Sequence, residues 1–200
     1  MIRSKYHLVA QLTDLLLEFS GIVNAFQAKS SGATLSFSAW MQRAEDLLSS
    51  HRLPQAARLA GVKSKMLAAS LQDERNGATR RRQIQAAIAA LDDAQQCLQD
   101  ALHPQAAKIE QARDVLRNLL QIVAHSGAIQ YEPKYGVATL IDQVWALCAK
   151  HDQLKAHAVQ LRSWLSFDDL RLLMAEEIEP ADFGASTGEN ISFYAARATK

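Results

Sequence analysis

The chain has 200 residues, of which 48% are hydrophobic and 22% are charged, and its 22 Lys and Arg residues nearly balance its 21 Asp and Glu residues. An apolar fraction of this size can build a core, so the composition excludes a disordered chain. With 8 Gly and 4 Pro, the chain is also neither collagen-like nor a low-complexity linker. The formal net charge of +1 gives no overall argument for a nucleic-acid or membrane partner, so any such binding must be local.

Helix-forming residues dominate the sequence, and strand-favouring residues are scattered rather than alternating, which predicts an all-α protein. The first long helix is indicated by apolar residues that step by four and three and therefore lie on one helix face. A second helix is predicted from Ser36 and a third from Pro54, because proline suits the first turn of a helix. The apolar face of the first helix comprises Leu8, Leu12, Leu15, Phe19, Ile22 and Phe26.

Two further long helices are predicted on either side of His103-Pro104, because an interior proline normally ends a helix. So short a connection predicts an antiparallel αα-hairpin over residues 80–126. A continuous helix is predicted over 137–165, and Ser166, with Asp169 three residues later, indicates the start of a short helix that reaches Ile178. The predicted buried face of the hairpin comprises Ile84, Ile88, Leu91, Gln95, Leu98, Leu102, Ile109, Ala112, Leu116, Leu119 and Val123.

These elements predict an antiparallel helical bundle of about six helices over residues 1–180. A flexible, acidic-to-polar tail is expected over 181–200. Within this tail Ile191, Phe193 and Tyr194 form an apolar cluster in an otherwise small and polar segment. Burying aromatic side chains stabilises even a short peptide, so we expect the cluster to dock on its own bundle, on another subunit or on a partner. The alternative is a disordered end.

No phosphate-binding loop, hydrolase elbow or Cys-x-x-Cys motif occurs in the sequence, and we predict neither a catalytic group nor a bound metal or cofactor. Cys148 and His151 are three residues apart on one helix face, but further metal ligands are missing. We expect both to be bundle residues and Cys97 to be a reduced core cysteine. The acidic pairs at 92–93, 168–169 and 176–177 are expected on solvated helix surface.

Four arginines surround the Asn76-Gly77 turn, namely Arg75, Arg80, Arg81 and Arg82. Such a cluster can contact phosphates without reading bases, which makes it a candidate nucleic-acid site. The alternative is a solvated helix end, which the nearby Asp73 and Glu74 favour because they neutralise part of the charge.

A bundle without a constellation of ligand-binding residues is more typical of an interaction, adaptor or assembly protein than of an enzyme. We therefore expect a protein partner or self-association, with nucleic-acid association as the alternative and enzymatic activity as the third class. The sequence shows no signal peptide and no apolar run of about 18 residues, so we expect a cytoplasmic protein without a membrane segment. No small-molecule substrate is indicated.

Overall fold

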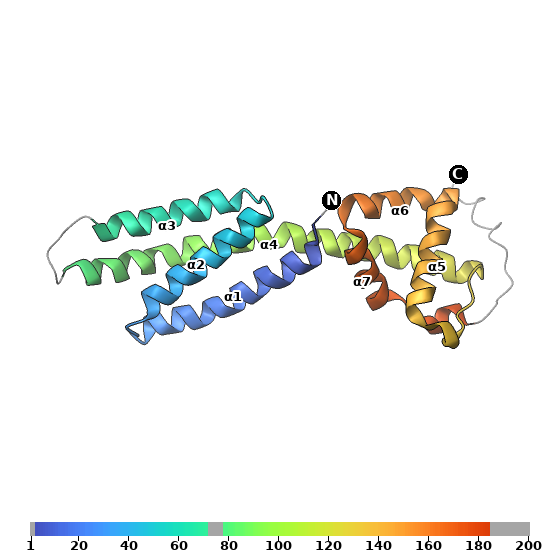
Figure 1. Cartoon of the computed structure of the whole chain (residues 1–200), viewed down its shortest axis with the longest axis horizontal. Coiled ribbons are helices and arrows are strands. Elements are labelled where there is room, and N and C mark those ends of the chain that lie inside the picture. The colour runs from blue at the N-terminus through green and yellow to red at the C-terminus, as the bar shows by residue number, and fades with distance from the viewer. Residues whose placement is uncertain (1–2, 72–77, 185–200) are drawn as a thin grey trace, which may run out of the picture. The chain divides into compact units, whose positions relative to one another are not determined.

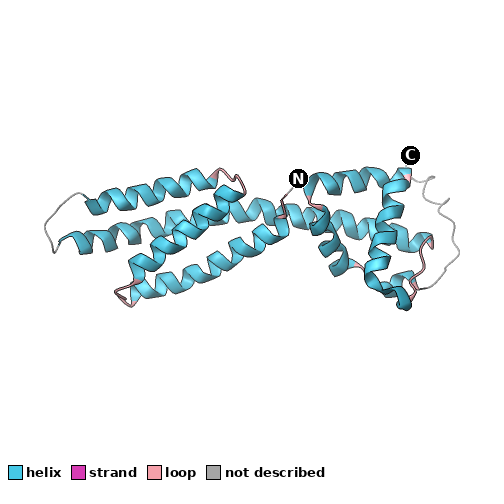
Figure 2. Ribbon diagram, viewed as in Figure 1, coloured by secondary structure: helices cyan, strands magenta, loops and turns pink. Residues whose placement is uncertain are grey.

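The structure is a computed structural model of the chain, and it describes residues 3–71 and 78–184. Within these residues the chain forms helices and no strand, which confirms the predicted all-α fold (Figure 2). The α-helices are α1 (Lys5–Gln27), α2 (Ala33–Ser50), α3 (Gln55–Leu71), α4 (Ala78–Ser126), α5 (Gly136–Lys150), α6 (Asp152–Trp164) and α7 (Phe167–Glu177). Two 3-10 helices, η1 (Pro133–Tyr135) and η2 (Pro180–Phe183), complete the described elements.

Within the residues that the structure describes, the helices group into two compact units. The N-terminal unit comprises Tyr6–Ala107, and the C-terminal unit comprises Met1–Lys5 together with Lys108–Lys200. Helix α4 contributes its first part to the N-terminal unit and its last part to the C-terminal unit. The tail cluster of Ile191, Phe193 and Tyr194 lies outside the described residues, so its docking stays a prediction.

The N-terminal unit is a bundle of α1, α2, α3 and the first part of α4, with successive helices running in opposite directions (Figure 1). The apolar face predicted for α1 is confirmed, since five of its six residues are buried and Phe26 packs against the core. Trp40 of α2 is fully buried, and its indole N–H donates a hydrogen bond of 2.8 Å to the carbonyl of Leu15. The ring of Phe19 lies 5.0 Å from that of Trp40, so aromatic packing joins α1 to α2.

The buried face of α4 in this unit differs from the predicted one. Ile84 and Ile88 are 37% and 49% exposed, so their assignment to the buried face is wrong. Small residues occupy that face instead, because a helix that packs close to its neighbours has room for alanine rather than for isoleucine. The buried residues of this segment are Ala87, Ala90, Leu91, Ala94, Cys97, Leu98 and Ala101.

The predicted hairpin over 80–126 is also wrong, because α4 continues through Pro104 as one helix of 49 residues. Proline has no N–H to donate to the carbonyl four residues earlier, which here belongs to Asp100. The side-chain amide of Gln55 in α3 donates to that carbonyl instead, at 3.2 Å. A hydrogen bond from the neighbouring helix α3 therefore partly replaces the backbone hydrogen bond that the proline removes.

The C-terminal unit contains the end of α4 with α5, α6 and α7. Helix α4 ends at Ser126 as predicted, and Gly127 follows with a φ of 63°, a left-handed conformation that favours glycine. The predicted continuous helix over 137–165 is wrong, because His151 has extended backbone angles that separate α5 from α6. The carbonyl of His151 accepts the N–H groups of Leu154 and Lys155, so a new helix begins there.

The last predicted helix is confirmed as α7. The Ser166 hydroxyl accepts a hydrogen bond of 3.1 Å from the N–H of Asp169, which is the predicted N-cap. Helix α7 ends at Glu177, close to the predicted end at Ile178.

Candidate interaction surfaces

An aromatic cluster lies at the surface of the C-terminal unit, where α5 meets α7. The rings of Trp145 and Phe167 are 5.9 Å apart between centroids and meet edge to face. Phe167 is 40% exposed, and Trp145 is partly exposed. The guanidinium of Arg171 lies 6.0 Å from the Phe167 ring and forms an ion pair of 3.3 Å with Asp142. We call these four residues the aromatic cluster.

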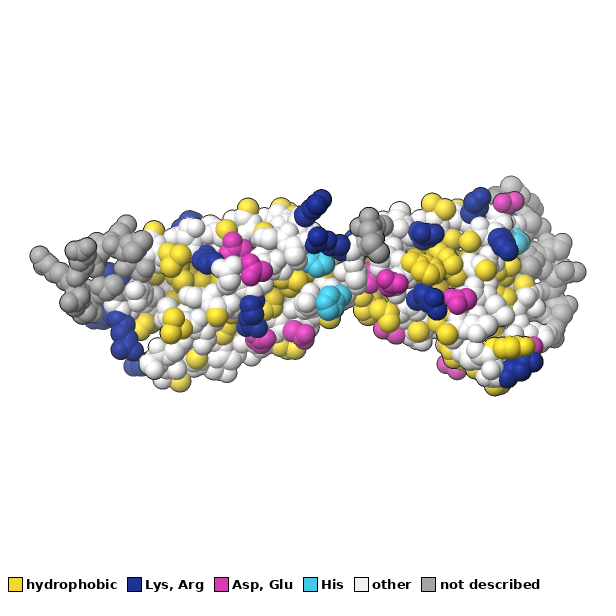
Figure 3. Space-filling view, viewed as in Figure 1, with side chains coloured by type: hydrophobic (Ala, Val, Ile, Leu, Met, Phe, Trp, Pro, Cys, Tyr) yellow, Lys and Arg dark blue, Asp and Glu magenta, His cyan; other side chains and the backbone are white. Residues whose placement is uncertain are grey.

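Local sequence explains why these side chains meet. Ser166 caps α7, so Phe167 is its first helical residue, and Arg171 follows one turn later on the same face. Asp142 and Trp145 are likewise separated by three residues on α5, which places both on one side of that helix. On the visible face of this unit, hydrophobic side chains gather between α5, α6 and α7, with charged side chains beside them (Figure 3). Apolar periodicity does not predict this cluster, because periodicity identifies buried helix faces and not contacts between exposed side chains.

The arginine cluster is described in part. Arg80, Arg81 and Arg82 lie in the first turns of α4 and are exposed, whereas Arg75 lies outside the described residues. Consecutive helical residues point about 100° apart, so the three side chains spread around the helix rather than converging on one point. This arrangement suits loose contact with a phosphate backbone better than a pocket for a single phosphate group.

Asp169 was expected on solvated surface, and this expectation is wrong. Its side chain is fully buried, and its carboxylate accepts hydrogen bonds from the Ser4 hydroxyl and, at 2.9 Å, from the backbone N–H of Lys5. Burial, followed by the neighbouring Lys108, lowers the pKa of the Lys5 ammonium. Because the oxygens of the Asp169 carboxylate already accept hydrogen bonds from the chain's own donors, this carboxylate has a structural role.

The acidic pair in α7 is also less solvated than expected. Glu177 has a side chain that is 10% exposed, and it pairs with Arg113 and, at 2.5 Å, with Arg117, both on α4. Hydrogen bonds from Arg117 and Arg113 lower the pKa of the Glu177 carboxyl. Glu176 lies 3.1 Å from Arg113 in the same network, whereas Asp92 and Asp93 are exposed as expected.

Cys148 and His151 lie in different environments. Cys148 is fully buried, and burial raises the pKa of its thiol to about 12, as expected for an unreactive core cysteine. His151 occupies the α5–α6 junction, and its Nδ1 atom is buried without a hydrogen-bond partner among the described residues. Across residues 3–71 and 78–184, no three His, Cys, Asp or Glu side chains gather as metal ligands.

Helix α1 is apolar and long enough to span a membrane by composition and length, although no such segment was expected. Core helices of soluble proteins and signal sequences near an N-terminus meet the same criterion. Comparison of the chain with protein-family models, curated proteins and solved structures finds no match.

Proposed function

We propose that this chain is a non-enzymatic interaction or adaptor protein whose C-terminal unit binds a protein partner through the aromatic cluster. The observation that supports this is the exposure of Phe167 beside Trp145 and Arg171. Aromatic residues and arginine are the residue types that concentrate binding energy at protein interfaces. A partner that covers the rings removes apolar surface from water and strengthens the nearby charge interactions.

The cluster is held by packed helices rather than by a loop. Phe167 and Arg171 belong to α7, which is anchored in the unit by the buried Leu170, Leu173 and Met174. A side chain that is positioned before binding loses less conformational freedom when a partner arrives, which favours affinity. The exposed Val159 of α6, at 62%, adds to the apolar surface of the same unit.

The test compares two single variants of α7. In Phe167→Ser the aromatic cluster loses its most exposed ring, whereas Leu172→Ser removes a leucine that is 53% exposed and points about 140° away around the helix. Both variants are compared with the unchanged chain as immobilised bait in extract of its native cells. We expect a stoichiometric partner to be retained by the unchanged chain and by Leu172→Ser and to be lost with Phe167→Ser.

The captured partner is then produced separately and its affinity for the three baits is measured, which removes indirect association. Circular dichroism of each bait checks that its helices are intact. Equal capture and equal affinity with all three baits would contradict the proposal.

Nucleic-acid association through the arginine cluster is the second candidate function. The exposure of Arg80, Arg81 and Arg82 at one end of the N-terminal unit favours it. Anisotropy titrations with labelled duplex DNA and single-stranded RNA at about 50 and about 200 mM salt test it, because phosphate contacts weaken steeply over that range. Replacing all three by alanine should weaken binding equally for all sequences and flatten its salt dependence. The unchanged chain's failure to bind at low salt would exclude this candidate.

A further inference from the structure

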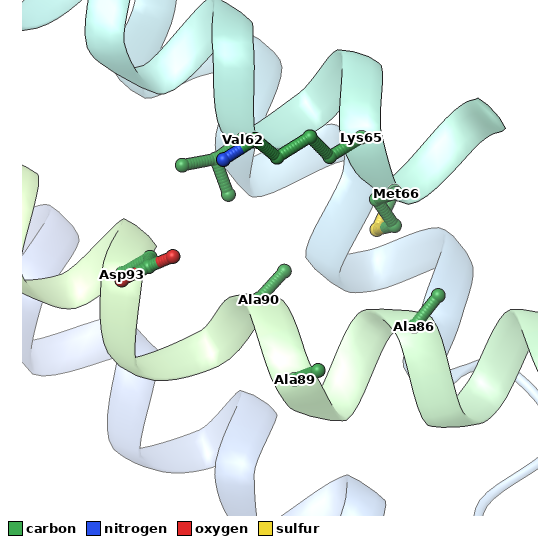
Figure 4. Close-up of a pocket in the computed structure, with 7 residues that line it drawn as sticks. All are labelled: Val62, Lys65, Met66, Ala86, Ala89, Ala90 and Asp93. Atoms are coloured by element: carbon green, nitrogen blue, oxygen red, sulfur yellow. The ribbon is translucent and has the colours of Figure 1, made fainter. Parts of the chain in front are cut away.

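An open groove runs between α3 and α4 on the N-terminal unit (Figure 4). It holds a cavity of about 220 Å³. Its apolar lining consists of Val62 and Met66 from α3 and of alanines from α4, while Lys65 and Asp93 stand on opposite sides of it. The lining residues are Val62, Lys65, Met66, Ala86, Ala89, Ala90 and Asp93.

On α3, the exposed surface beside this groove carries a stripe of small residues. Four small, exposed residues of α3 repeat at steps of four and three and therefore form one stripe: Ala57, Gly61, Ser64 and Ala68. A Cβ atom added at Gly61 would meet nothing within 4 Å, so packing inside this chain does not require glycine there. Glycine in a helix interior costs stability relative to alanine, and its usual benefit is the close approach of another backbone. On this face, the space for such an approach lies outside the chain.

Charged side chains lie on both helices beside this groove. Helix α3 contributes Arg58 and Lys65, and α4 contributes Asp93 and Asp100. Arg58 pairs with Asp100 at 2.5 Å. In the described part of the chain, no ion pair joins Lys65 or Asp93 to another residue, although the two face each other across the groove (Figure 4). The groove thus has one cation on its α3 side and one carboxylate on its α4 side.

We propose that this face binds the same face of a second copy of the chain, around a two-fold axis parallel to α3 and α4. Such a rotation places α3 of each copy opposite α4 of the other. The Lys65 side chain extends along the groove toward the end where Asp93 lies (Figure 4), so each Lys65 ammonium then comes near Asp93 of the other copy. An isologous interface must be self-complementary in this way, and a cation on one helix with an anion on its neighbour satisfies the requirement twice.

The size of the face sets the expected strength of association. Helix α3 has 17 residues and is about 25 Å long, and two helices of this length present a surface at the low end for specific interfaces. A reversible, concentration-dependent dimer is therefore expected rather than a permanent one. This inference concerns the N-terminal unit and does not rest on the aromatic cluster.

Sedimentation velocity of the full chain from about 1 μM to about 1 mM, the range in which weak protein pairs associate, tests the proposal. The unchanged chain should shift from monomer to dimer with rising concentration. Lys65→Asp places two carboxylates opposite each other at both contacts, and Asp93→Lys places two ammonium groups there. Each variant alone should remain monomeric at concentrations where the unchanged chain is dimeric.

The decisive sample is an equimolar mixture of the two variants. A copy with Asp at both positions and a copy with Lys at both positions are complementary at both contacts, so the mixture should regain the dimer. This recovery also shows that both variants are folded. Asp92→Lys is the matched control, because it makes the same charge change on the adjacent exposed residue of α4, about 100° around the helix, and it should dimerise like the unchanged chain.

Three results would overturn the proposal. The first is an unchanged chain that stays monomeric throughout the concentration range. The second is a dimer that persists in Lys65→Asp and Asp93→Lys, or singles that remain monomeric when mixed. The third is a dimer that Phe167→Ser abolishes while the groove variants do not, which would place self-association on the C-terminal unit.

Discussion

The side-chain amide of Gln55 donates a hydrogen bond to the backbone carbonyl of Asp100, the one carbonyl that Pro104 leaves without its helical donor. Proline within a helix costs about 3 kcal/mol or more, because it removes this bond and its ring crowds the same carbonyl. Gln55 satisfies the freed acceptor from the neighbouring helix α3. The uninterrupted course of α4 through Pro104 is therefore coupled to the packing of α3.

Pro104→Ala should raise the free energy of unfolding, by about 1 to 3 kcal/mol, since alanine restores the helical N–H and removes the ring. Gln55→Ala should cost about 1 kcal/mol in the unchanged chain and close to nothing when Ala occupies position 104, because the Asp100 carbonyl then has a backbone donor. Urea denaturation of the four chains measures this double-mutant cycle. Equal costs of Gln55→Ala in both backgrounds would refute the coupling.

Leu119→Asp should unfold the chain or nearly so, whereas Ile88→Asp should leave it folded. Leu119 is 2% exposed in the core of the C-terminal unit, and an uncompensated carboxylate there costs several kcal/mol out of a total stability of about 5 to 15 kcal/mol. Ile88 is 49% exposed, so the same change should alter stability by about 0.5 kcal/mol or less. Thermal melts of both variants check the contrast, and a severe loss in Ile88→Asp would contradict the burial described for α4.

Asp169→Ala should destabilise the C-terminal unit by about 1 to 3 kcal/mol, because it leaves the Ser4 hydroxyl and the Lys5 N–H without their acceptor. The neighbouring Asp168 is exposed and serves as the control. Asp168→Ala should change stability much less, despite removing the same charge from the same helix turn. Guanidinium denaturation followed by tryptophan fluorescence is a suitable measurement, and similar losses in the two variants would argue against the buried carboxylate's role.

Low pH should remove the contribution of Glu177 to the free energy of unfolding. Hydrogen bonds from Arg117 and Arg113 lower its pKa in the folded chain below the ordinary value of 4.5. The stabilisation is therefore fully present above pH 4.5 and is lost as the pH falls through the lower, folded-state pKa. Glu177→Gln should be less stable than the unchanged chain at pH 7, and the difference should shrink in acid. A difference that does not change with pH would mean that the carboxylate's charge contributes nothing, and Glu179→Gln, at an exposed position, is the control.

The all-α class and the helix ends that carry strong local signals were predictable from sequence. Ser166 and Gly127 act through the backbone within one turn, so a cap and a left-handed stop are readable without tertiary information. The course of the chain through Pro104 was not predictable, because it depends on Gln55, 49 positions away, at 3.2 Å from the carbonyl. The separation of α5 from α6 at His151 was hidden because apolar spacing continues on both sides of it.

The candidate surfaces were likewise predictable only in part from the sequence. The exposure of Arg80, Arg81 and Arg82 agrees with their charge, but the burial of Asp169 depends on Ser4 and Lys5 from the other end of the chain. Apolar periodicity predicts large side chains on the buried face of α4, whereas close helix packing selects for small ones there. The aromatic cluster and the α3–α4 groove arise from pairs of helices, so periodicity within one helix cannot indicate them.

Each compact unit contains one of the two cysteines, Cys97 in the N-terminal unit and Cys148 in the C-terminal unit. Both are fully buried, and burial raises the pKa of both thiols, so a thiol-reactive dye in solution reaches neither in the native state. Each thiol becomes reactive when the helices around it open. The chain therefore contains a built-in reporter for each half: single-cysteine versions, with serine at the other site, reveal whether the halves open at one rate or at two.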